Sequence, residues 1–169
     1  MKTFKQLLVE LRACEEAIDW AQDMPIEEVV RTCHRGDWLL WLANKVDIDK
    51  RKLTLAKAHC ANTVRHLMKD QRSINAIDVA IAYGNNQADD EQLKTSFTSA
   101  EVAATKSAAA AFLSPSDAAI IHIFSSAAAT AVCAADNVAR TKNLKQTADI
   151  CREYIGQLLI NKVNEQINK

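Results

Sequence analysis

The stretch CHRGDWLLWLA at residues 33–43 is the segment that decides how the fold is interpreted. Gly36 and Asp37 are residue types that end one helix and begin the next. Glycine adopts the left-handed conformation of a helix terminus, and an aspartate side chain accepts from the free N–H groups of a helix start. The tryptophans and leucines that follow form a short helix that is apolar nearly all round. We therefore predict a helix junction here, followed by a helix that is buried on several sides or meets a partner.

Helical patterns flank this junction on both sides. Apolar residues recur at helical spacing over residues 3–22, which predicts one long first helix. Pro25 suits the first position of a short second helix, because the missing N–H costs nothing there. The helix that carries the two tryptophans is expected to end near Val46.

Further helices follow along the chain. Residues 47–68 form a longer helical pattern, and the next helix is expected to run from a cap at Ser73 to a stop at Gly84. The least apolar stretch, NNQADDEQ at residues 85–92, predicts the main internal loop. Beyond it the chain turns Ala-rich, which favours helix, and the last helix is expected from about Asn143.

The whole chain is predicted to be all-α. Only three glycines and two prolines interrupt it, and alternating runs of β-branched residues are absent. A length of 169 residues suits one domain over residues 1–169, with about seven or eight helices. We divide it into a short-helix half at 1–84, the loop at 85–92 and a half at 93–169 with long antiparallel Ala-rich helices. A cap at Ser114 is expected to separate those long helices.

The charge balance argues against a nucleic-acid partner, and the short apolar runs argue against a membrane partner. Acidic and basic residues number 21 each, whereas a protein that binds nucleic acid usually carries a basic stripe. The best candidate stripe, Lys50, Arg51 and Lys52 with Lys57, is short, and we interpret it as a solvated helix start. No apolar run reaches the ~18 residues of a membrane span, and the N-terminus does not resemble a signal peptide. We expect no nucleic-acid partner, no membrane partner and a cytoplasmic location.

The chemistry-bearing residues do not form a known catalytic or metal-binding pattern. Histidines adjacent to cysteines lack the spacing of zinc ligands, and three glycines are too few for a phosphate loop. No serine or cysteine lies in a glycine-rich elbow. We expect no catalytic residue, no metal and no cofactor. The cysteines are odd in number, widely spaced and flanked by helix-forming residues, which predicts small buried hydrophobic side chains in a reducing compartment: Cys14, Cys33, Cys60, Cys133 and Cys151.

Four segments together resemble a known family. They are ACEEAIDW at 13–20, CHRGDWLLWLA at 33–43, KRKLTLAKAHCA at 50–61 and AIDVAIAYG at 76–84, and an Ala-rich helical tail follows them. With these segments the chain is similar to immunity proteins associated with bacterial polymorphic toxin systems. The resemblance implies an all-helical, non-enzymatic cytoplasmic protein that binds and neutralises a cognate toxin. Similar proteins in phages and mobile elements would equally suit interference with a host defence.

Arg35, Asp37, Trp38 and Trp41 are our candidate partner-binding residues, with Trp20 as a packing neighbour. Protein interfaces often place aromatic anchors inside a polar rim, although tryptophans on helices are more often core. The helix junction does not require an arginine. Pairing with a buried carboxylate would make Arg35 structural, and an outward position beside an indole would favour function. The alternative function is a structural or scaffold protein that forms a homodimer through its Ala-rich helices.

Overall fold

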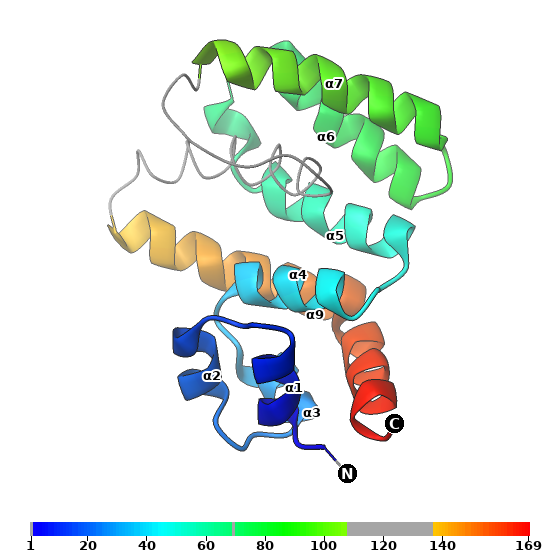
Figure 1. The fold of residues 1–169 in the computed structure, drawn as a ribbon. Helices are drawn as coiled ribbons and strands as arrows, with labels where there is room; N and C mark the ends of the chain where they lie inside the picture. Colours follow the sequence, from blue (N-terminus) through cyan, green and yellow to red (C-terminus); the bar gives the residue numbers. More distant parts are fainter. Residues whose placement is uncertain (1, 69, 108–136) are drawn as a thin grey trace.

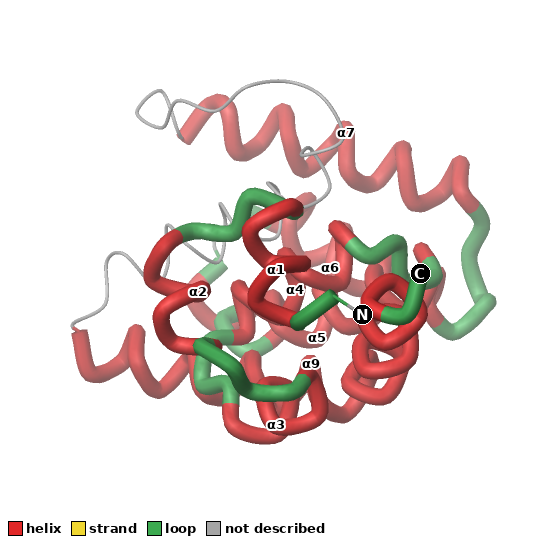
Figure 2. The backbone as a smooth tube through the Cα atoms, turned by 60° about the horizontal axis from the view of Figure 1, so that its bottom comes forward, coloured by secondary structure: helices red, strands yellow, loops and turns green. Residues whose placement is uncertain are grey.

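Helices alone build the part of the chain that the structure describes (Figures 1 and 2). The computed structural model describes residues 2–68, 70–107 and 137–169, without the side chains of 102–107 and 137–140. Within these ranges there are eight α-helices, one 3-10 turn and no strand. The predicted all-α class is confirmed. None of the helices in these ranges is both long and apolar enough to cross a membrane.

Short helices come first along the chain and long helices come later. The elements are α1 (Phe4–Glu10), α2 (Glu15–Ala21), α3 (Ile26–Thr32), α4 (Gly36–Lys45), α5 (Lys50–Asn62), the 3-10 turn η1 (Arg65–Leu67), α6 (Gln71–Gly84), α7 (Asp90–Ser107) and α9 (Asn137–Ile167). Helices α7 and α9 have 18 and 31 residues, whereas α1, α2 and α3 have seven each. The expected cap at Ser114, and most of the Ala-rich stretch expected to mediate self-association, lie outside the described residues.

Helix α5 is the centre of the fold. One side of α5 packs on α4 and α9, and the other packs on α6, which carries α7 (Figure 1). Leu53, Ala56 and Cys60 of α5 belong to a larger core shared with α1, α3, α4 and α9. Ala58 and Ala61 belong to a smaller core shared with α6 and α7. Among the described residues, the two long helices therefore pack mainly on helices of the first half rather than on each other.

The predicted first helix over residues 3–22 is wrong, because the chain breaks between α1 and α2. Arg12 adopts a left-handed conformation with φ 59°, and the Ala13 N–H donates to the Leu8 carbonyl at 2.9 Å. Leu11 and Ala13 both pack on the larger core. The apolar periodicity continues through the break because both helices turn toward the same core, so the pattern did not reveal it.

The predicted roles of Gly36 and Asp37 are also wrong. Helix α4 begins at Gly36 itself, Arg35 is its N-cap residue, and none of the three glycines has a positive φ. Asp37 lies in the first turn and bonds to Arg35. Gly36 is required by packing instead, because a Cβ there would lie 2.6 Å from the carbonyl carbon of Thr147 in α9. The missing side chain lets α9 cross directly against α4.

Other helix ends differ from the prediction by a few residues. Pro25 is the N-cap residue of α3 rather than its first residue. Asp70, not Ser73, caps α6, and its side chain accepts from the Arg72 N–H at 2.9 Å. The loop that follows α6 is shorter than predicted, since α7 already begins at Asp90.

Later boundaries show the same kind of difference. The predicted helix over residues 47–68 divides into α5 and η1, and α9 begins at Asn137, before the predicted Asn143. The predicted end near Val46 is confirmed, because Val46 is the C-cap residue of α4. Gly84 is the last residue of α6, as expected.

Two predictions about burial are wrong. Lys57 is only 6% exposed, although it was expected on a solvated helix start. Arg51 is half-buried and donates to the carbonyls of Tyr83 at 2.6 Å and Ala88 at 3.1 Å. Cys14 is exposed, whereas the other cysteines whose side chains the structure describes are buried. Local sequence did not distinguish these cases, because the burial of each side chain depends on which helices pack around it.

Candidate functional site

A cavity of about 520 Å³ opens between helices α1 to α4. Its floor belongs to the larger core and is apolar: Phe4 and Leu8 of α1, Val29 of α3, and Leu39 and Leu42 of α4. Half-buried and exposed side chains border its opening: Arg12, Cys14, Trp20, Arg35, Asp37, Trp38 and Trp41. We call this cavity the tryptophan pocket, because all three tryptophans of the chain line it.

Aromatic rings tie α2 to α4 at one side of the pocket. The ring of Trp20 on α2 lies 5.9 Å from the ring of Trp38 on α4, with 52° between the planes. His34 lies next to both, at 5.9 Å from Trp20 and 6.4 Å from Trp38. These centroid distances fall within the roughly 4.5–7 Å that aromatic pairs prefer. The helix α2, which has only seven residues, is thereby held against α4.

Arg35 joins the aromatic cluster to two carboxylates. Its guanidinium lies 4.5 Å from the centre of the Trp38 ring, in a cation–π arrangement. Its Nε and Nη2 donate to the two carboxylate oxygens of Asp37 at 2.9 and 2.7 Å, and its Nη1 donates to Glu16 at 3.3 Å. The hydrogen bonds to Asp37 raise the pKa of Arg35 above its already high ordinary value. Arg35 therefore stays charged while its charge is neutralised locally.

The carboxylates beside Arg35 are exposed. The side chains of Asp37 and Glu16 are 49% and 70% exposed, while that of Arg35 is 21% exposed. Exposed ion pairs contribute little to stability, so these pairs are not what holds the fold together. The arginine is neither buried with a carboxylate nor free in solvent. It lies on an indole at the edge of the pocket, between the two positions that we distinguished from the sequence.

The junction between α3 and α4 positions Arg35, and α9 holds that junction. Arg152 of α9 donates from Nη1 to the carbonyls of Val30 at 3.2 Å and Cys33 at 2.7 Å, at the end of α3. The buried Cys33 thiol donates to the Arg35 carbonyl at 3.4 Å, and burial raises the pKa of this thiol. Sequence reasoning missed Arg152, because it lies more than a hundred residues from the junction and no local pattern connects the two.

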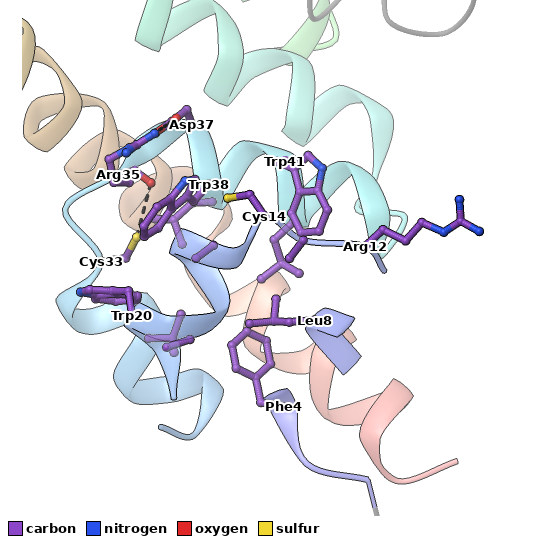
Figure 3. Close-up of a pocket in the computed structure, with 16 residues that line it drawn as sticks. Phe4, Leu8, Arg12, Cys14, Trp20, Cys33, Arg35, Asp37, Trp38 and Trp41 are labelled. Atoms are coloured by element: carbon purple, nitrogen blue, oxygen red, sulfur yellow. Dashed lines mark hydrogen bonds and ion pairs between the residues drawn. The ribbon is translucent and has the colours of Figure 1, made fainter. Parts of the chain in front are cut away.

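Besides Ala13, the link between α1 and α2 contributes two chemically functional side chains to the lining, and sequence reasoning missed both as site residues. Arg12 extends away from the other labelled side chains of the pocket, as Figure 3 shows. Across residues 2–68, 70–101 and 141–169, its guanidinium has no hydrogen-bond or ion-pair partner. Cys14 is the N-cap residue of α2 but makes no capping hydrogen bond. The prediction of one continuous helix over residues 3–22 concealed both positions.

The structure brings all four predicted partner-binding residues to one pocket. Arg35, Asp37, Trp38 and Trp41 line it together, and the predicted neighbour Trp20 lines it as well (Figure 3). Trp38 and Trp41 are three residues apart on α4 and are both half-buried. The sequence therefore predicted which residues meet, although it assigned wrong local roles to some of them.

The lining of this site is suited to holding an apolar group. An apolar floor with a few polar groups at its edge is the usual composition of a ligand or anchor pocket. Across the described ranges, His, Cys, Asp and Glu side chains do not gather in any group of three or more that could hold a metal ion. Comparisons of the chain with protein-family models, curated proteins and solved structures find no match. The fold and site define an all-helical protein with an open tryptophan pocket.

Proposed function

We propose that this chain is a non-enzymatic binding protein of the immunity or inhibitor type. It neutralises a toxin or another protein partner by binding it directly at the tryptophan pocket. One observation carries the proposal, namely that all three tryptophans and the Arg35–Asp37 pair surround one open apolar cavity. Binding energy in protein interfaces is concentrated in aromatic and arginine anchors near apolar pockets inside a polar rim.

The pocket suits an anchor from a protein partner. An apolar anchor that packs on the pocket floor buries apolar surface away from water, which stabilises the complex by roughly 25 cal/mol per Å² of buried apolar surface. The rim carries two cations, Arg12 and Arg35, and one anion, Asp37, which can bond to polar groups around the anchor, and Glu16 bonds to Arg35 beside them. A partner held here would be covered by α2 and α4, and inhibition follows where its active site is the covered surface.

The proposal includes a cytoplasmic location. Cys33, Cys60 and Cys151 are free thiols, and the sulfurs of the last two lie 3.9 Å apart without a bond. Closely placed free thiols are typical of proteins from a reducing compartment. The resemblance to immunity proteins favours a toxin as the partner, and a host-defence protein inhibited by a mobile element fits the same site.

The test uses the product of the gene adjacent to this one. That product is expressed from an inducible promoter in a bacterial host, with wild-type protein or with an Arg35→Ala, Asp37→Ala double variant, and growth and binding affinity are measured. The matched control is Arg31→Ala with Glu28→Ala, because these residues form an exposed two-bond pair on α3 away from the pocket lining.

Wild type and the Arg31, Glu28 control are expected to restore growth. The Arg35, Asp37 variant is expected to bind at least about tenfold more weakly, which corresponds to about 1.4 kcal/mol. Equal protection and equal affinity for both double variants would remove the pocket rim from the interface. A neighbouring product that is neither bound nor neutralised would reject the immunity role for that pair.

A further inference from the structure

The tryptophan pocket is large enough for a substantial guest. Its volume of about 520 Å³ lies within the roughly 300–1,000 Å³ of pockets that enclose whole ligands. The floor residues Phe4, Leu8, Leu39 and Leu42 are each at least 95% buried, so the cavity reaches into the larger core. A guest here exchanges water for apolar walls on several sides, as a residue of a protein core does.

Charge in and around the pocket favours an uncharged guest. Arg35 is already neutralised by Asp37 and Glu16, and the Arg12 side chain extends away from the cavity (Figure 3). Among the side chains that the structure describes, no buried nitrogen or oxygen lacks a hydrogen-bond partner. A charged guest inside the cavity would therefore lose its hydration without a counter-charge beside it, because Arg12, the lining cation that has no partner among the described side chains, is exposed and directed away from the other labelled side chains.

Ring geometry favours an aromatic guest over an aliphatic one. Trp38 is contacted by the Arg35 guanidinium at 4.5 Å and by the Trp20 ring at 5.9 Å, yet it remains half-buried rather than enclosed. Trp41 is also half-buried on the same helix and lines the same cavity. Lys45 Nζ lies 5.9 Å from the centre of the Trp41 ring, and because both indoles are only half-buried, ring surface remains for an edge-to-face or offset-stacked neighbour. An aliphatic group would fill the floor but would not gain these ring contacts.

The pocket rim and the remaining surface of the chain favour another protein as the source of the aromatic group. Charges of both signs at the opening can bond to the backbone and polar groups that flank a side chain. The described ranges of a second copy of this chain offer no exposed aromatic residue for this role, because their exposed large hydrophobic residues are aliphatic: Val9, Leu67 and Leu158. We infer that the occupant of the tryptophan pocket is an uncharged aromatic side chain of the protein partner. This inference rests on the proposed function.

The experiment uses N-acetyl-tryptophanamide as a mimic of such a side chain. The probe is added to the full chain, and the indole N–H signals of its tryptophans are followed by NMR. Trp20, Trp38 and Trp41 all line the pocket, so no indole elsewhere in the chain contributes background. N-acetyl-leucinamide tests an aliphatic side chain of similar polarity, and indole-3-acetate tests an aromatic anion.

Saturable shifts are expected with the tryptophan amide, with an affinity about tenfold higher than for the leucine amide or the anion. Ala17→Phe fills the pocket from α2 and is expected to abolish the shifts. The control Ser99→Phe adds the same ring on the exposed face of α7 and is expected to change nothing. Equal affinity for the leucine and tryptophan amides, tighter binding of the anion, or unchanged shifts in Ala17→Phe would overturn the inference.

If circular dichroism shows that Ala17→Phe does not fold, Trp41→Leu provides a second variant that keeps the pocket wall apolar. Its expected result is loss of the preference for tryptophan over leucine amide, and a retained preference would overturn the aromatic assignment. Partner binding that tolerates Ala17→Phe, while probe binding is lost, would overturn the proposed function at this pocket. If partner binding needs the open pocket but the pocket binds the tryptophan and leucine amides equally, the aromatic nature of the occupant would be overturned and the proposed function would stand.

Discussion

Gly36 of α4 lies directly against Thr147 of α9, so closely that a Cβ added at Gly36 would come within 2.6 Å of the Thr147 carbonyl carbon. Gly36→Ala is therefore expected to push α9 away from α4 and to lower the free energy of unfolding by about 1–3 kcal/mol. Urea unfolding followed by circular dichroism measures the change.

Gly156→Ala on α9 is the matched control. Its Cβ would meet Cγ1 of Val30 at 3.3 Å, which needs a shift of only a few tenths of an ångström, and alanine gains helix propensity over glycine by about 1 kcal/mol. This variant is expected to stay within about 1 kcal/mol of wild type. Similar losses in both variants would show that the α4–α9 crossing is not the tight point of the fold.

The break between α1 and α2 carries backbone strain. Arg12 has φ 59°, a conformation that costs a residue with a side chain roughly 1–2 kcal/mol. Arg12→Gly removes this strain but increases the freedom of the unfolded chain, so stability is expected to rise by up to about 1 kcal/mol. Lys5→Gly, at an exposed position within α1, is expected to lower stability by about 1 kcal/mol. Urea unfolding measures both changes, and destabilisation by both substitutions would contradict the left-handed geometry at Arg12.

Burial lowers the pKa of Lys57 to about 8, because desolvation disfavours its charged ammonium. The unfolded chain keeps an ordinary value near 10.5, so between pH 8 and 10.5 it binds more protons than the folded chain. The contribution of Lys57 to the free energy of unfolding therefore rises with pH across this window, and its penalty is largest below pH 8.

Lys57→Met is expected to stabilise the protein at pH 7 by up to about 3 kcal/mol, with an advantage that shrinks toward pH 10. Chemical unfolding at several pH values measures this difference. Lys52→Met, at an exposed position on the same helix, is expected to show no such pH dependence. A constant advantage of Lys57→Met at every pH would mean that the ammonium is not penalised by burial.

The cysteines are expected to differ in their reactivity. Cys14 is exposed, whereas Cys33, Cys60 and Cys151 are buried. The hydrogen bond with Cys60, and then burial, raise the pKa of Cys151 and keep it a thiol rather than the reactive thiolate. In a Cys133→Ser background, a maleimide is expected to label the folded chain at Cys14 alone. Mass spectrometry measures the labelling.

Adding Cys14→Ser to that background should leave the folded chain unlabelled, and denaturant should expose the remaining thiols. Rapid labelling of a second cysteine in the folded chain would show that α5, α9 or the α3–α4 junction opens readily.

Much of the candidate site could be predicted from residues 33–43. The local pattern placed Trp38 and Trp41 on one short helix and marked Arg35 as a residue that the junction did not need. The other wall of the pocket was not predicted, because the periodicity of residues 3–22 is the same for one helix and for two helices that face one core. The sequence pattern therefore did not predict that Cys14 and Arg12 line the pocket.

The sequence by itself determined the helical class and several helix ends, such as those at Val46 and Gly84, because helix propensity and apolar spacing are local properties of the chain. Only the tertiary structure decided why residue 36 is a glycine, because the requirement comes from α9, more than a hundred residues away. It also decided the burial of Lys57, which depends on the helices that pack around α5. The pocket arises in the same way, where a left-handed turn at Arg12 lets α2 lie against α4.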